Sequence, residues 1–299
     1  MLAAEYKGPY RVRASRKALP VIEHPRDAVV RVTRSCICGS DLHLYHGMVP
    51  DTRIGTTFGH EFCGVVEEVG EAVHNLKLGD HVLVPFNIAC GQCHFCRQGL
   101  FGNCHEANAQ ATAVGGIFGY SHTAGGYEGG QAQYVRVPYA DFGPSVIPDW
   151  MDADDAVMLT DVVPTGYQAA EMGGIQKGDT VVVFGAGPVG IMAARCAWLF
   201  GAGRVILIDH LDYRLDFARR YCPAETYNFR EIDDMVRTHA TRRVISAVAH
   251  GLPPVTGVPR NSELGLLRHQ MELQRPSQSI RDMIAKMPQA FPKLAPCML

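Results

Sequence analysis

The chain has 299 residues, of which 47% are hydrophobic and 19% are charged, so its composition is that of a globular protein with room for two domains. Its formal net charge of −2 provides no general field that would attract nucleic acid or an anionic membrane, and we therefore expect small-molecule partners. No run approaches the roughly 20 apolar residues of a membrane span, and the N-terminal segment lacks a secretory signal pattern. These features predict a cytoplasmic protein with reduced cysteines.

The first half of the chain is predicted to be rich in β-structure. Short β-forming runs at 27–32, 64–69 and 81–85 alternate with turns marked by glycine and proline. The recurrent glycines fit the bends of a small closed or partly open barrel. We assign residues 1–150 to this domain.

The pattern changes after this domain. An alanine-rich helical segment precedes an apolar run at 179–184, which is predicted to be a buried parallel strand. A helix at about 189–200, a second strand at 204–208 and a helix at about 213–221 follow. Together they form a βαβα unit, typical of a nucleotide-binding domain, and we assign residues 151–240 to it.

Four of the ten cysteines are clustered, with two, two and seven residues between them. Four thiolates satisfy a closed tetrahedral zinc site, which leaves no open position for a substrate and is therefore structural. An iron–sulfur cluster is the competing interpretation, but no proline follows the fourth cysteine and there is no second cluster run. The sequence favours one structural zinc ion, bound by Cys90, Cys93, Cys96 and Cys104.

Two residues upstream indicate a second, open metal site. Cys38 lies in the run C-G-S-D-L-H, and His60 lies in G-H-E. They offer two donors, whereas a catalytic zinc needs three protein ligands and an open fourth position. By themselves, these residues are equally consistent with a buried cysteine and a hydrogen-bonded loop histidine.

A glycine-rich turn follows the strand predicted at 179–184. Its residues are Gly185, Ala186, Gly187, Pro188, Val189 and Gly190. In this context, Gly185 makes the tight turn, Gly187 lets the backbone approach a pyrophosphate at the helix N-terminus, and Gly190 allows close helix–strand packing. Asp209 ends the second strand and favours NAD over NADP, whereas the nearby Arg214 keeps NADP open.

Taken in order, the C-G-S-D-x-H run, the G-H-E run, the cysteine cluster and the glycine-rich turn resemble the zinc-containing medium-chain dehydrogenase/reductases over about residues 8–235. The resemblance implies a fold of mixed α/β and β class, with a GroES-like β-barrel catalytic domain and a Rossmann domain. It implies two zinc ions per chain, NAD as the cofactor, and an alcohol or aldehyde as the substrate. The cysteine cluster disfavours a zinc-free quinone reductase of the same superfamily.

The resemblance also assigns the residues of the metal site. Cys38 and His60 correspond to two ligands of the catalytic zinc, and Asp161, otherwise a plain turn carboxylate, corresponds to the third. Many alcohol dehydrogenases have cysteine at that third position, whereas an aspartate resembles the branch of glutathione-independent formaldehyde dehydrogenases. Glu61 corresponds to a carboxylate beside the metal, and Asp41 to a group that orients His60.

Two further residues correspond to a path for a proton. Ser40 would take the alcohol proton through its hydroxyl, and His43 would pass it to solvent. Without the resemblance, Ser40 would be interpreted as a turn residue and His43 as a surface histidine.

The resemblance stops near residue 237. Residues 241–299 are rich in proline and lack strand–helix alternation, and we expect an atypical tail, irregular or with weak helices at 262–274 and 278–287. The abrupt change favours an out-of-frame gene over a natural appendage. We therefore expect an incomplete Rossmann domain, which makes the homo-oligomer usual in the family doubtful. The alternative function is a non-catalytic remnant that binds zinc and nucleotide.

Overall fold

The computed structural model describes residues 1–109 and 115–231. The chain divides into two compact units, Met1–Asp161 and Val162–Leu299. The tail predicted at 241–299, with its two weak helices, lies outside the described residues. Among the residues that are described, no helix has both the length and the apolar composition that crossing a membrane requires.

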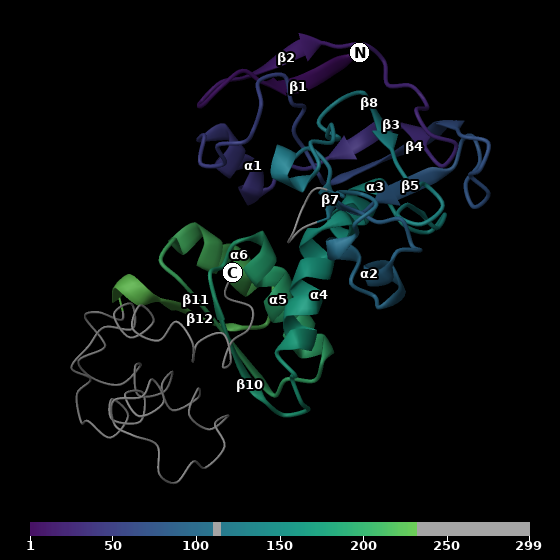
Figure 1. The fold of residues 1–299 in the computed structure, drawn as a ribbon. Coiled ribbons are helices and arrows are strands. Elements are labelled where there is room, and N and C mark those ends of the chain that lie inside the picture. The colour runs from purple at the N-terminus through teal and green to yellow at the C-terminus, as the bar shows by residue number, and fades with distance from the viewer. Residues whose placement is uncertain (110–114, 232–299) are drawn as a thin grey trace. The chain divides into compact units, whose positions relative to one another are not determined.

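An antiparallel sheet of five strands forms the centre of the first unit (Figure 1). Its strand order is β8-β3-β4-β5-β9. The strands are β3 (Ala28–Ser35), β4 (Phe62–Val69), β5 (His81–Val84), β8 (Tyr134–Val137) and β9 (Ser145–Val146). The runs predicted as strands at 27–32, 64–69 and 81–85 correspond to β3, β4 and β5, so these predictions are confirmed.

Alternate side chains of these strands build the core of the first unit. Val30 of β3, Phe62 of β4 and Val82 of β5 are fully buried, because every second side chain of a strand points to the same face. The ring of Phe62 meets that of Phe118 edge to face, with 5.3 Å between centroids. Since Phe62 directly follows His60 and Glu61, the core fixes the position of both residues.

Smaller elements accompany this sheet. Two short antiparallel pairs are β1 (Leu2–Tyr6) with β2 (Val12–Arg16) and β6 (Asn87–Ile88) with β7 (Gly116–Ile117). The helices are α1 (Gly39–Tyr45), α2 (His94–Arg97) and α3 (Ala153–Ala156), and the 3-10 turns are η1 (Phe101–Asn103), η2 (His122–Ala124) and η3 (Val157–Thr160). Helix α3 contacts β3, and η3 contacts β4 and β5, so both elements belong to the first unit although they lie beyond residue 150.

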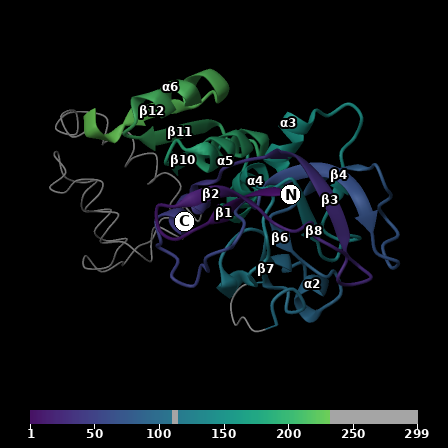
Figure 2. The same ribbon diagram turned by 90° about the horizontal axis from the view of Figure 1, so that it is seen from above.

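The second unit contains a parallel sheet of order β10-β11-β12 (Figure 2). Its elements are α4 (Val162–Met172), β10 (Thr180–Phe184), α5 (Pro188–Leu199), β11 (Arg204–Asp209), α6 (Asp212–Tyr221) and β12 (Glu225–Asn228). The predicted βαβα order of this segment is confirmed. Strand β12 was not predicted, because its four residues Glu-Thr-Tyr-Asn carry no apolar run.

The two faces of this sheet carry separate apolar clusters. On one face, Val205 and Leu207 of β11 pack with Ala194 of α5 and Leu215 of α6. On the other, Ile206 and Ile208 pack with side chains of β10 and β12. Strand β11 is buried on both faces, as expected for a central parallel strand.

Candidate metal sites and nucleotide-binding turn

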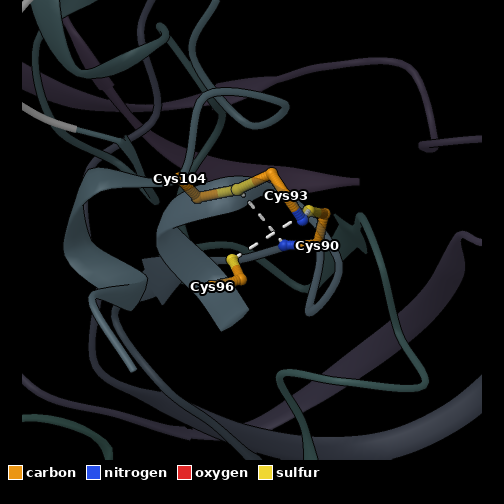
Figure 3. Close-up of side chains that lie close together, drawn as sticks. All are labelled: Cys90, Cys93, Cys96 and Cys104. Atoms are coloured by element: carbon orange, nitrogen blue, oxygen red, sulfur yellow. Dashed lines mark hydrogen bonds between the residues drawn. The ribbon is translucent and has the colours of Figure 1, made fainter. Parts of the chain in front are cut away.

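The four clustered cysteines, which we call the cysteine lobe, converge on one point (Figure 3). Cys90 follows β6, and Cys104 follows η1. Cys93 directly precedes α2, and Cys96 lies within it. Their sulfur atoms lie within 4.8 Å of one another, with 4.0 Å between Cys90 and Cys96 and 3.9 Å between Cys93 and Cys104. Sulfurs at about 2.3 Å from a tetrahedral zinc lie about 3.8 Å apart, whereas a disulfide bond measures about 2.05 Å. The spacing therefore fits four ligands of one ion.

The surroundings of these thiols favour a cation. The backbone N–H groups of Gln92 and Cys93 lie 3.4 and 3.3 Å from the sulfur of Cys90. Donation from the backbone of Cys96 lowers the pKa of Cys93 to about 6, whereas burial raises the pKa of Cys96 to about 12. Four thiolates so close together repel one another, and a divalent ion removes that penalty.

A second group of possible ligands forms within the first unit. Cys38 precedes α1, His60 and Glu61 precede β4, and Asp161 follows η3. One donor atom from each lies within 4.8 Å of the others. Nε2 of His60 is 3.1 Å from Oδ2 of Asp161, so this nitrogen faces the other donors. The structure thus brings together Cys38, His60 and Asp161, which are far apart in the sequence, and with them Glu61, the carboxylate predicted beside the metal.

This second group is partly buried, with His60 and Glu61 fully enclosed, and its charges are unbalanced without a cation. Burial raises the pKa of Glu61 above its ordinary value, and the charge of Asp161 adds to that effect. Burial opposes protonation of His60, but hydrogen bonds with Asp161 and Cys38, together with the charge of Asp41, outweigh it and raise the pKa to about 10. A proton on His60 would thus take the place of a metal ion in the metal-free protein.

The opposite nitrogen of His60 faces Asp41. Nδ1 of His60 lies 3.8 Å from Oδ1 of Asp41, and both side chains are almost fully buried. Neither atom has a hydrogen-bond partner among the described residues. A ligand histidine usually donates its second N–H to such a carboxylate, so the pair fits a metal bound at Nε2 of His60.

Asp41 is itself held by Gln131, a residue that the sequence did not predict to belong to the site. Its Oδ2 accepts hydrogen bonds from the backbone N–H of Cys38 and from Nε2 of Gln131, both at 2.9 Å. Only the paired glycines before Gln131, at positions 129 and 130, mark this as a point of close backbone approach.

The two residues predicted to carry the proton lie on α1. Oγ of Ser40 is 3.4 Å from Nε2 of His60, which places the hydroxyl beside the donor atoms. His43 is exposed, one turn of helix further on. The role of Ser40 and His43 in moving a proton stays a prediction.

The glycine-rich turn joins β10 to α5. Gly185 has a φ of +94°, which favours glycine, and Gly187 precedes the first residue of the helix, Pro188. A β-carbon on Gly190 would overlap the carbonyl oxygen of Gly185. Val189 lies in the first turn of α5 and is 40% exposed. The geometry is that of a tight strand–turn–helix connection, as a pyrophosphate site requires.

Asp209 at the end of β11 holds this turn. Its Oδ2 accepts from the backbone N–H of Ala186 at 2.7 Å, and its Oδ1 accepts from His210 at 2.6 Å and Leu211 at 3.1 Å. Arg214 reaches to 3.8 Å from Oδ2. The carboxylate therefore stabilises the glycine-rich turn. Its contact with the ribose of a cofactor stays a prediction.

Comparison with known proteins agrees with this class of zinc-binding, two-domain fold. Residues 24–149 match the family described as the alcohol dehydrogenase GroES-like domain. The alcohol dehydrogenase TADH from Thermus sp. ATN1 superposes with a TM-score of 0.74 at 37% identity, covering 82% of this chain and 66% of that one.

Similarity to curated sequences defines the family. A medium chain reductase/dehydrogenase of Acremonium sp. is 35% identical over 74% of this chain and 73% of its own length. An uncharacterized zinc-type alcohol dehydrogenase-like protein of Bacillus subtilis is 44% identical over 77% of this chain, and a glutathione-independent formaldehyde dehydrogenase of Pseudomonas aeruginosa is 40% identical over 72%. The chain belongs to the zinc-containing medium-chain dehydrogenase/reductase family. It spans 61% and 55% of the length of these Bacillus and Pseudomonas relatives.

Proposed function

We propose that the protein is a zinc-dependent oxidoreductase that transfers a hydride between an alcohol, or the hydrate of formaldehyde, and NAD. The observation that carries the proposal is the convergence of Cys38, His60, Glu61 and Asp161 within 4.8 Å. Three of these residues can hold a zinc ion and leave a fourth position for the substrate oxygen, whereas the four-cysteine site is closed.

The donor set supports a catalytic rather than a structural metal. Cys38, His60 and Asp161 would hold the zinc, with the carboxylate of Glu61 beside it. When bound, the zinc supplies a Lewis acid that lowers the pKa of an alcohol hydroxyl. The third ligand would be the carboxylate of Asp161, where many alcohol dehydrogenases have cysteine. This feature resembles the formaldehyde dehydrogenase branch.

Two further residues of the site would carry the proton of the substrate hydroxyl to solvent. Oγ of Ser40, which is 3.4 Å from Nε2 of His60, would accept the proton of a substrate hydroxyl. The exposed imidazole of His43 is then available to release that proton to solvent.

The turn from Gly185 to Gly190 would bind the pyrophosphate of the cofactor. Asp209 would contact its ribose. A carboxylate there repels a 2′-phosphate and so supports NAD. The guanidinium of Arg214, 3.8 Å from Oδ2 of Asp209, would attract a 2′-phosphate and keeps NADP open.

The alternative function is a zinc- and nucleotide-binding protein without turnover, which needs only the four-cysteine site and the glycine-rich turn. The test is to purify the full chain, count its zinc ions and measure NADH formation with small alcohols and with formaldehyde. Two zinc ions with alcohol- or formaldehyde-dependent NADH formation would support the oxidoreductase. Two zinc ions without turnover on any of these substrates would support the remnant.

The matched variant in that test is Cys38→Ala. It should abolish turnover while the four-cysteine site keeps its zinc. Turnover that survives in Cys38→Ala would show that the measured activity does not come from this site.

A further inference from the structure

The side chain of Gln131 links two segments that carry the metal site. Its Nε2 donates to Oδ2 of Asp41 at 2.9 Å and to the backbone carbonyl of Cys36 at 3.2 Å. Both partners are acceptors, so only the amide NH2 group can face them. Gln131 therefore ties the loop before Cys38 to the carboxylate that faces His60.

The backbone around Gln131 keeps this side chain in place. Its N–H donates to the carbonyl of Phe58 at 2.9 Å, and its carbonyl accepts from Ala4 at 2.8 Å. Gly59 has a φ of +99°, and a β-carbon there would come within 2.7 Å of the nitrogen of Gln131. The close approach of this segment to the residue before His60 leaves the amide little freedom.

The consequence concerns the two oxygens of Asp41. Its Oδ2 already accepts from Gln131 and from the backbone of Cys38, so Oδ1 is the oxygen left to face Nδ1 of His60, 3.8 Å away. Among the described residues, Oδ1 of Asp41 and Nδ1 of His60 are buried without any hydrogen-bond partner, and each is the polar atom that faces the other. If Asp41 rotated, Nδ1 of His60 would have no acceptor facing it, and a buried N–H without an acceptor is unfavourable.

We propose that Gln131 is a positioning residue of the Cys38–His60–Asp161 metal site. Its amide holds Asp41 so that Oδ1 accepts the proton on Nδ1 of His60, which leaves Nε2 of the neutral ring unprotonated toward the metal. The inference rests on the proposed metal site and adds a residue that never touches the metal or the substrate.

The test uses Gln131→Met, which keeps the length of the side chain and removes both donors. Gln133→Met is the matched control, because Gln133 lies two residues away and its side chain accepts a hydrogen bond from the backbone N–H of Leu2, outside the metal site. Zinc affinity of both sites is measured on the full chain by competition with a chelator. Loss of the outer partner of a ligand histidine, here Asp41, typically weakens a metal site about 10- to 100-fold, which is the upper limit for the loss of Gln131. Within that limit, we expect a loss of more than about twofold at the Cys38–His60–Asp161 site of Gln131→Met. Neither that site in Gln133→Met nor the four-cysteine site of either variant should lose affinity.

A second readout separates positioning from general packing. Nitrogen-15 chemical shifts of His60 in the zinc-loaded protein report which ring nitrogen carries the proton and whether it is hydrogen-bonded. The wild type and Gln133→Met should show a proton on Nδ1 that is hydrogen-bonded to a carboxylate, and Gln131→Met should lose that signature. If Gln131→Met also released the zinc of the cysteine lobe, Gln131→Glu would replace it, because its carboxylate repels Asp41 without changing the shape.

The outcomes distinguish this inference from the proposed function. If the wild type binds two zinc ions without turnover, the oxidoreductase proposal fails while the role of Gln131 is still decided by affinity and chemical shift. If affinity in the Gln131 variants stays within about twofold of Gln133→Met and the signature of His60 is unchanged, the positioning role is overturned. A wild type that binds only the zinc of the cysteine lobe overturns both.

Discussion

Replacing Asp209 by asparagine should destabilise the second unit, because its carboxylate accepts three backbone hydrogen bonds while it is 4% exposed. Asparagine keeps one oxygen for the N–H groups of His210 and Leu211 but turns an NH2 group toward the N–H of Ala186. One charge-assisted hydrogen bond is lost and a buried donor is left unpaired. At roughly 1.5–3 kcal/mol for the first and 1–3 kcal/mol for the second, with partial relaxation, we expect a loss of about 2–4 kcal/mol.

The assay is urea unfolding followed by the fluorescence of Trp198, which lies in α5. The other tryptophan of the chain, Trp150, is replaced by phenylalanine so that only the second unit is observed. The control is Asp216→Asn, whose carboxylate makes an exposed ion pair with Arg219 and should contribute about 0–1 kcal/mol. If Asp209→Asn unfolded within about 0.5 kcal/mol of the wild type, the structural role of this carboxylate would be refuted.

The effect of Asp209 should also depend on pH. Burial opposes ionisation, but the backbone N–H groups of Ala186, His210 and Leu211 outweigh it and lower the pKa of Asp209 below the ordinary 3.8. Because the pKa is lower in the folded state, the stabilisation is present above the unfolded value and is lost as the pH falls through the folded one. The difference between the wild type and Asp209→Asn should therefore shrink below about pH 4. Separately, Asp209→Gly should weaken discrimination against NADP if Asp209 contacts the ribose.

Three further predictions concern the first unit. Phe62→Ala should lower the free energy of unfolding by about 3–5 kcal/mol in urea titrations, since the side chain is fully buried against Phe118, and a loss below about 1 kcal/mol would contradict that packing. Cys93→Ala should release the zinc of the cysteine lobe and lower the melting temperature before any effect on turnover is seen; an unchanged melting curve would argue against a structural metal. His60 must lose a proton to bind metal, and its pKa in the metal-free protein is raised to about 10, so zinc affinity at that site should rise by about tenfold or more per pH unit from pH 6 to 9, since a cysteine ligand also binds as the thiolate. Calorimetry in buffers of different ionisation enthalpy measures the released proton, and binding without proton release would exclude this assignment.

Much of the fold could be predicted because its signals are local. The apolar run that became β10 lies between turn residues, and the glycine-rich turn that follows requires backbone angles and close contacts that glycine alone provides. The cysteine lobe was equally clear, since its four ligands lie within one short segment and their spacing alone indicates a metal.

The features that were missed depend on contacts between distant segments. Strand β12 is polar, and only its pairing with β11 makes it a strand. Gln131 is 90 residues from Asp41, and no local pattern marks an amide that holds a carboxylate. Asp161 could be placed near Cys38 and His60 only through family resemblance, because separations of this length carry no spacing rule.

The most direct test of the account is the zinc content of purified protein carrying Asp161→Ala, compared with the wild type and with Asp155→Ala. Asp155 is an exposed carboxylate on α3 and serves as the matched control. We predict two zinc ions per chain in the wild type and in Asp155→Ala, and one in Asp161→Ala, which retains the ion of the cysteine lobe. Two tightly bound zinc ions in Asp161→Ala, or only one in the wild type, would contradict the assignment of Cys38, His60 and Asp161 as a metal site.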